Sequence, residues 1–287
     1  MRRDGVLLLG GAGFIGSALS KRLQRENRPV HILGRQQEAE LEHVLPQYGT
    51  VVHLACSTTP GVSASNPSLE LGNLALTLRL LDLLKSRPDT HLIFFSSGGT
   101  VYGNPQNLPV TEDSPLAPLS HHGASKASQE FFCGVLRARG HAVTVLRPSN
   151  AYGPGQTIKS GFGLVRTVLE HARLGTEMEI WGDGESVRDF IHVDDVAEAC
   201  ARLVSLPEDS GTYNLGSGKG HSVNEVLRVA ERASGRVVKR VYRPVRTVDV
   251  RDIVLDISLL KTRLSWGPQF TLEEGVKRSW EWLLRQP

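Results

Sequence analysis

Short apolar runs alternate with segments of helical periodicity along the first half of the chain. Five runs predict strands: Val6–Leu9, Val30–Leu33, Val51–Ala55, His91–Ser96 and Ala142–Arg147. Three intervening segments repeat their apolar positions at helical spacing: Phe14–Glu26, Asn73–Lys85 and Ser125–Arg139. Because strands that alternate with helices pair in parallel, the pattern predicts an α/β fold with a doubly wound parallel sheet.

The second half is less regular. Further helices are expected at Gly161–Leu174, Val193–Leu206, Ser222–Ser234 and Thr271–Arg285, with a short strand at Glu179–Trp181. Asp194 and Asp195 in the first turn favour a helix start after His192, because acidic groups stabilise a helix N-terminus. These segments predict a smaller lobe.

Composition excludes several classes of protein. The net charge is +3, and no Lys/Arg run suggests a nucleic-acid partner. No apolar run is long enough to cross a membrane, and the N-terminus lacks a cleavage site. Cys56, Cys133 and Cys200 are widely spaced and form no CxxC pair, which favours buried free thiols in a reducing cytoplasm.

A glycine-rich turn follows the first predicted strand and opens the first predicted helix. Gly10, Gly13 and Gly16 are spaced at three residues, with Phe14 and Ile15 between the last two. Glycine lets a backbone approach a pyrophosphate, and free N–H groups at the helix start hold its charge. In this context the turn predicts a dinucleotide site.

The second predicted strand ends at Leu33 and is followed by Gly34 and Arg35. A carboxylate at this place normally binds the adenosine ribose of NAD, and none is present. Arg35 could instead pair with the 2′-phosphate of NADP. A solvated surface arginine is an equally good interpretation.

Several ordered segments resemble the extended short-chain dehydrogenase/reductase family, in particular nucleotide-sugar epimerases of the UDP-glucose 4-epimerase type. The segments are Gly10–Gly16, His53–Ala55, Ser96–Gly103, Gly123–Lys126, Arg147–Gly155 and Arg188–Asp195. The resemblance covers nearly the whole chain. It implies a Rossmann domain for NAD(P) over residues 1–150, with about 178–210 returning to it. It also implies that 151–287 form mainly a substrate-binding lobe.

The resemblance also implies roles for single residues. Four residues would line the cofactor: Leu54, Ala55, Asn73 and Lys126. In the family, the lysine also lowers the pKa of the proton acceptor, and Lys126 would have this role here.

On the substrate side, Asn150, Arg188 and Arg246 would contact the diphosphate of a nucleotide sugar, with a UDP-hexose as the expected substrate. A surface or core ion pair is the alternative for each arginine.

Three features depart from the family pattern. His122 stands where the family has its catalytic tyrosine, and Gly98 stands where it has a hydroxyl. Ser97 or Thr100 could supply the hydroxyl instead. The stretch between the second and third predicted strands is also shorter than in family members, which commonly insert another strand there.

His122 and Lys126 share a helix face because they are four residues apart. Neutral imidazole is a competent base, but its protonated form would be a cation beside Lys126 and an oxidised nicotinamide, and like charges disfavour that form. Four interpretations stay open: His122 is a working acid/base, His122 is a relic or engineered change in a binding protein, His121 or Tyr102 serves instead, or the reaction differs.

The expected activity is a UDP-hexose 4-epimerase-like reaction through transient hydride transfer to NAD(P). The alternatives are an NADP-dependent nucleotide-sugar reductase, a dehydratase, and a catalytically impaired nucleotide-sugar or dinucleotide-binding protein. The resemblance further implies a homodimer through a helix bundle that includes Ser125–Arg139.

Overall fold

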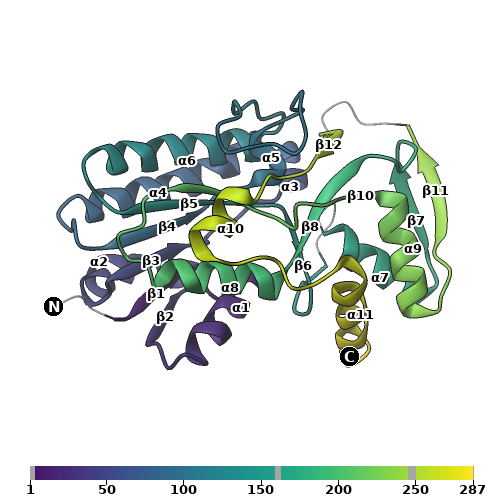
Figure 1. Cartoon of the computed structure of the whole chain (residues 1–287), viewed down its shortest axis with the longest axis horizontal. Coiled ribbons are helices and arrows are strands. Elements are labelled where there is room, and N and C mark those ends of the chain that lie inside the picture. Colours follow the sequence, from purple (N-terminus) through teal and green to yellow (C-terminus); the bar gives the residue numbers. More distant parts are fainter. Residues whose placement is uncertain (1–3, 159–162, 245–249, 287) are drawn as a thin grey trace.

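Six parallel strands form the centre of the larger lobe in the computed structural model, which describes residues 4–158, 163–244 and 250–286 (Figure 1). Their order is β2-β1-β3-β4-β5-β9. The strands are β1 (Val6–Leu9), β2 (Val30–Leu33), β3 (Thr50–His53), β4 (His91–Phe95), β5 (Val143–Pro148) and β9 (Thr212–Leu215). The predicted doubly wound α/β fold is confirmed.

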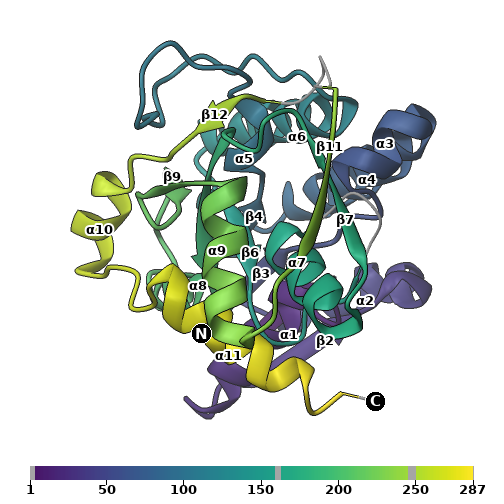
Figure 2. The ribbon, with the colours of Figure 1, turned by 90° about the vertical axis from the view of Figure 1, so that its right-hand side faces the viewer.

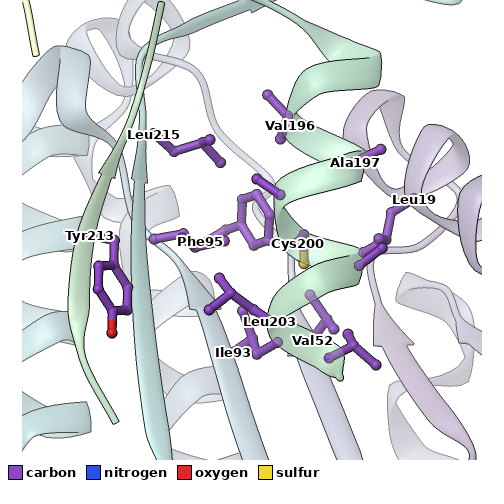
Figure 3. Packing of buried hydrophobic residues seen from close by; sticks show 14 of the residues in the cluster. Leu19, Val52, Ile93, Phe95, Val196, Ala197, Cys200, Leu203, Tyr213 and Leu215 are labelled. Atoms are coloured by element: carbon purple, nitrogen blue, oxygen red, sulfur yellow. The ribbon is translucent and has the colours of Figure 1, made fainter. Parts of the chain in front are cut away.

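Both faces of this sheet are apolar, which is why its strands read as continuous hydrophobic runs. Leu7 and Leu9 of β1 face one side, and Val6 and Leu8 face the other. One side is covered by α4 (Glu70–Leu84) and α6 (His121–Ala138), and the other by α1 (Phe14–Gln24) and α8 (Val193–Val204). Figure 3 shows α8 side chains packed against β3, β4 and β9.

The connection between β2 and β3 contains no strand. It forms two 3₁₀ turns, Arg35–Glu40 and Leu45–Gln47, around the short helix α2 (Leu41–Val44). Consequently β2 is the edge of the sheet. Other short elements of the larger lobe are α3 (Pro60–Ser65), a 3₁₀ turn at Pro67–Leu69 and α5 (Gly98–Val101).

The smaller lobe, whose ribbon faces the viewer in Figure 2, has its own hydrophobic core. Three helices form it, α7 (Leu164–Leu174), α9 (Val223–Ser234) and α11 (Leu272–Leu283), beside the parallel pair β7 (Glu177–Trp181) and β11 (Lys239–Arg243). A further sheet links the lobes through β6 (Asn150–Tyr152), β8 (Val187–His192), β10 (Gly220–Ser222) and β12 (Asp252–Ile253). The late helix α10 (Ser258–Leu264) packs in the larger lobe beside α8 and β9.

The predicted strands and helices of the first half agree with the structure to within a few residues at each end. The sixth strand, β9, was not predicted, because Thr212–Leu215 is short and lies between glycine- and serine-rich turns. The segment 193–215 returns to the main sheet, whereas Glu177–Trp181 pairs with β11 in the smaller lobe. None of the described helices is both long and apolar enough to span a membrane.

Candidate active site

The glycine-rich turn lies at the carboxyl end of β1, where tight packing requires the absence of side chains. Gly10 has φ of +80°, and a Cβ there would lie 2.7 Å from the Ala55 backbone. A Cβ on Gly16 would lie 2.6 Å from the Cα of Gly11. No side chain caps α1 at Gly13, and no acid lies in its first turn. The turn can therefore hold an anion on the first N–H groups of α1, which include those of Phe14 and Ile15.

Two segments border this turn at the same edge of the sheet. Leu54 donates its N–H to the carbonyl of Leu9 at 2.9 Å, which places Leu54 and Ala55 directly beside Gly10. Arg35 is exposed just beyond β2, and no ion pair or hydrogen bond engages its guanidinium in the part of the chain that the structure describes.

His122 and Lys126 lie one turn apart on the buried face of α6, where they are 8% and 5% exposed. Ser120 caps this helix by accepting the Gly123 N–H. Lys126 Nζ donates to the carbonyl of Phe95 at 2.8 Å, which fixes the ammonium at the carboxyl end of β4. The arrangement places an imidazole and a cation side by side, as the helical spacing predicted.

Two polar groups lie next to Nδ1 of the His122 imidazole, and a third residue, Asn73, holds them in place. The imidazole Nδ1 lies 3.2 Å from Thr58 Oγ1 and 3.5 Å from Glu70 Oε1. Thr58 donates to the same carboxylate oxygen at 2.6 Å. Asn73 donates to Thr58 at 3.0 Å and to Glu70 Oε2 at 2.8 Å, and its Oδ1 accepts the Ser57 N–H at 2.8 Å. Asn73 thus holds the loop after β3 against α4.

Cys56 lies in this loop, where His122 and Lys126 act on its thiol. Burial raises the pKa of its thiol, but the charge of Lys126 and a hydrogen bond from His122 outweigh it and lower the pKa to about 6. Its Sγ is 3.6 Å from Thr58 Oγ1. Cys133 and Cys200 are buried free thiols, as predicted, whereas Cys56 is a free thiol that is only partly buried and whose lowered pKa favours the thiolate.

The departure at Gly98 has a steric reason. A Cβ at Gly98 would lie 2.7 Å from Leu255 Cδ1 and 2.8 Å from the carbonyl of Arg147, so a serine does not fit this backbone. Thr100 donates weakly to the carbonyl of Ser97 at 3.4 Å. Neither Ser97 nor Thr100 forms a hydrogen bond with His122 or Lys126 among the described contacts.

Tyr102 and His121, the predicted alternatives to His122, lie in different surroundings. The phenol of Tyr102 is buried, donates to Asn214 Oδ1 at 2.6 Å and accepts from Arg147 Nη1 at 2.7 Å. Burial raises its pKa to about 12. His121 is exposed at the start of α6.

The predicted substrate contacts lie where β6 and β8 meet. Asn150 Nδ2 donates to the carbonyl of Asp189 at 3.0 Å, and the amide borders Gly99. Arg188 Nη1 donates to the carbonyls of Val187 at 2.9 Å and Arg251 at 2.6 Å. Arg246 lies outside the described residues.

Sequence reasoning missed Cys56, Thr58 and Glu70 as members of the site. One signal was available: Glu70 is three residues before Asn73 on the same helix, so a cofactor role for one places the other nearby. No metal-binding group of His, Cys, Asp and Glu occurs among the described residues.

Comparisons with known proteins show the family of this chain. A model of the NAD-dependent epimerase/dehydratase family matches residues 6–216. A putative UDP-glucose 4-epimerase of Methanocaldococcus jannaschii is 32% identical, with 97% of this chain and 98% of the relative covered.

Solved structures are similar over the whole chain. The UDP-glucose 4-epimerase of Thermotoga maritima with UDP-glucose has a TM-score of 0.91 at 32% identity, covering 98% of this chain and 99% of the other. TunA, an NAD-dependent NDP-hexosamine 5,6-dehydratase of tunicamycin biosynthesis, has a TM-score of 0.91 at 29% identity, covering 99% of both chains. The chain therefore belongs to the NAD-dependent epimerase/dehydratase family.

Proposed function

We propose that this protein is a UDP-hexose 4-epimerase-like enzyme that uses His122 as its proton acceptor. The placement of His122 and Lys126 on one face of α6, at the same edge of the sheet as the glycine-rich turn, carries the proposal. A base and a cation at this place suit the oxidation and reduction of a sugar hydroxyl. The relatives named above act on UDP-glucose or a related nucleotide sugar.

A dinucleotide fits the turn, because Gly10 and Gly16 leave a cradle that a single Cβ would fill. When bound, the nicotinamide would supply a reversible hydride acceptor. The residues of this chain would do the rest: the N-terminus of α1 would hold the pyrophosphate, and Lys126 would stabilise negative charge next to the reacting hydroxyl.

His122 would take the proton of the sugar 4-hydroxyl as the hydride leaves C4. It would return the proton after the 4-keto sugar has rotated to present its other face. Asn150 and Arg188 would face the diphosphate from the β6–β8 junction. Arg188 would first have to exchange its backbone carbonyl partners for phosphate oxygens. Arg246 stays a prediction.

NAD is the proposed cofactor, because the family description and TunA both specify NAD. One observation favours NADP and a reductase as the second candidate: Arg35 is exposed beyond β2 with no partner among the described residues. Denaturing the purified protein and identifying the released cofactor separates the two. Retained NAD⁺ supports an epimerase, whereas a site that takes up NADPH from solution supports a reductase.

The decisive assay incubates the protein with UDP-glucose, UDP-galactose and their N-acetyl forms, followed by chromatography of the products. Interconversion of any pair at C4 supports the proposal. Binding of the nucleotide sugars without conversion would instead support a catalytically impaired binding protein, and loss of water would support a dehydratase.

A homodimer through α6 is also proposed. Phe131 and Val135, one turn apart on this helix, are 67% and 52% exposed, and Leu71 of the neighbouring α4 is 69% exposed. Large apolar side chains in such numbers on one pair of helices are typical of an interaction surface.

A further inference from the structure

A buried carboxylate faces the imidazole of His122, although the epimerase proposal assigns it no function. Glu70 is 8% exposed, and its Oε1 lies 3.5 Å from Nδ1 of His122. Burial raises the pKa of Glu70, but hydrogen bonds from Thr58, Asn73 and nearby serines lower it below its usual range. Glu70 is therefore a stable anion against the ring.

The hydrogen-bond directions around Thr58 determine which ring nitrogen of His122 carries the proton. A carboxylate only accepts, so the single hydrogen of the Thr58 hydroxyl points to Glu70 at 2.6 Å. Toward His122, Thr58 can then only accept, and so can Glu70. Both of these neighbours of Nδ1 are acceptors, so a neutral ring carries its hydrogen on Nδ1 and its lone pair on Nε2.

We propose that Glu70 is the positioning residue that makes His122 a proton acceptor, by holding the Nδ1–H tautomer and by neutralising the imidazolium. This inference rests on the proposed function. In the step concerned, the hydroxyl O–H bond breaks and its proton moves to Nε2, while the C–H bond yields a hydride to the oxidised nicotinamide. The alcohol would lose two electrons to become a ketone, and these would leave with the hydride.

The carboxylate of Glu70 also compensates the positive charge that a protonated His122 adds beside Lys126. A tyrosinate would bring one negative charge to Lys126, whereas a protonated imidazole adds a positive one. Glu70 supplies the missing negative charge from the other side of the ring, at 3.5 Å from Nδ1. The site thus keeps its charge balance without the phenol.

Glu70→Gln has a definite expected effect, because the side-chain amide of Asn73 cannot exchange its oxygen and nitrogen positions. Asn73 Oδ1 accepts the backbone N–H of Ser57, so its Nδ2 must point to residue 70 and needs an acceptor there. The glutamine oxygen is drawn to Asn73, and its NH₂ then donates to Thr58. The Thr58 hydrogen is released toward His122 Nδ1, and the ring is forced into the Nε2–H tautomer, which cannot accept the proton.

The first readout is spectroscopic and needs no activity. Long-range ¹H–¹⁵N correlation of the histidine rings at pH 8, with His122→Tyr to assign the signal, should show Nδ1–H in the wild type and Nε2–H in Glu70→Gln. An unchanged tautomer would overturn the proposal. Asp82→Asn, an acid-to-amide change on the exposed face of the same helix, should leave the tautomer as it is.

The second readout is a double-mutant cycle on kcat. Glu70→Gln should lower kcat about 100-fold or more in the wild type, as loss of a working acid/base does, with little change in KM. In the His122→Tyr background, where no imidazole needs orienting, the same change should cost less than about threefold. An equal loss in both backgrounds would make Glu70 merely structural and overturn the inference.

Thr58→Val serves if Glu70→Gln does not fold. It removes the bridging hydroxyl but leaves the carboxylate, so the Nδ1–H tautomer should persist, and its loss would contradict the role of Glu70. A wild type that interconverts no UDP-sugar would refute the epimerase proposal, whereas the tautomer would still decide whether Glu70 orients His122.

Discussion

At the residue scale, the chemistry of this site depends on side chains that lie far apart in the sequence. The loop after β3 supplies Cys56 and Thr58, α4 supplies Glu70, and α6 supplies His122 and Lys126. The helical spacing predicted the pair on α6. It could not predict the loop contacts, because nothing local to residues 56–58 indicates that α6 packs over them.

The lowered pKa of Cys56 predicts fast alkylation near neutral pH. A depressed pKa means that the thiolate is present above about pH 6 and is lost as the pH falls through that value. The rate of modification by iodoacetamide, followed by mass spectrometry, should rise through about pH 6 and then level off. Bound NAD should slow it.

Two internal controls are available in the same chain. Cys133 and Cys200 are buried, and burial raises the pKa of both thiols, that of Cys133 to about 12, so neither should react. His122→Phe should shift the Cys56 profile to higher pH, because it removes a hydrogen bond that favours the thiolate. A profile centred on the ordinary thiol pKa of about 8.5 in the wild type would contradict this account.

His122→Phe should also abolish epimerisation while leaving nucleotide-sugar binding intact. The ring is replaced by one of similar shape that cannot take a proton, so a loss of about 100-fold or more in kcat is expected. Product chromatography measures the rate, and calorimetry with UDP measures binding. Retained activity would show that another group accepts the proton.

At the element scale, the glycine at position 16 lets helix α1 pack closely against the glycine-rich turn. A Cβ on Gly16 of α1 would meet the backbone of the turn itself, whereas a Cβ on Gly72 of α4 would have nothing within 4 Å. Both are helical glycines, but only Gly16 packs against the backbone of the turn that is proposed to hold the pyrophosphate.

Gly16→Ala should therefore weaken NAD binding at least about tenfold, a change of about 1.4 kcal/mol, because the turn must open to admit the methyl group. Gly72→Ala should leave binding unchanged. Calorimetry with NAD measures both, and circular dichroism checks that the fold persists. Equal affinity in the two variants would contradict a pyrophosphate site at α1.

At the scale of the whole molecule, long-range contacts assemble the two lobes from interleaved segments. The strand β9 and helix α10 come from the second half of the chain and complete the main sheet and its cover (Figure 1). Buried Asp189 lies at the junction and accepts from Ser149, Ser217 and the Leu255 N–H. A site between the two lobes is therefore complete only when β9 and α10 have packed onto the larger lobe.

The exposed face of α6 predicts association of two copies. Phe131→Asp together with Val135→Asp should convert a dimer to a monomer, because each change places a charge in an apolar contact. Light scattering after size-exclusion chromatography measures the mass. Val237→Asp, at the 82% exposed Val237 of the smaller lobe, is the matched control. A monomeric wild type would refute the proposed dimer.

By itself, the sequence determined the strand–helix alternation, the dinucleotide turn and the His122–Lys126 pair, because periods of two and 3.6 residues and glycine spacing are local properties. The sequence also showed that the family's phenol and hydroxyl are absent at positions 122 and 98. Only the tertiary structure brought Glu70, Thr58 and Cys56 to the imidazole, and only it showed that Leu255 leaves no room for a serine at Gly98. Such contacts depend on how α4, α6 and the loop after β3 pack, and that packing follows from the burial of the whole core.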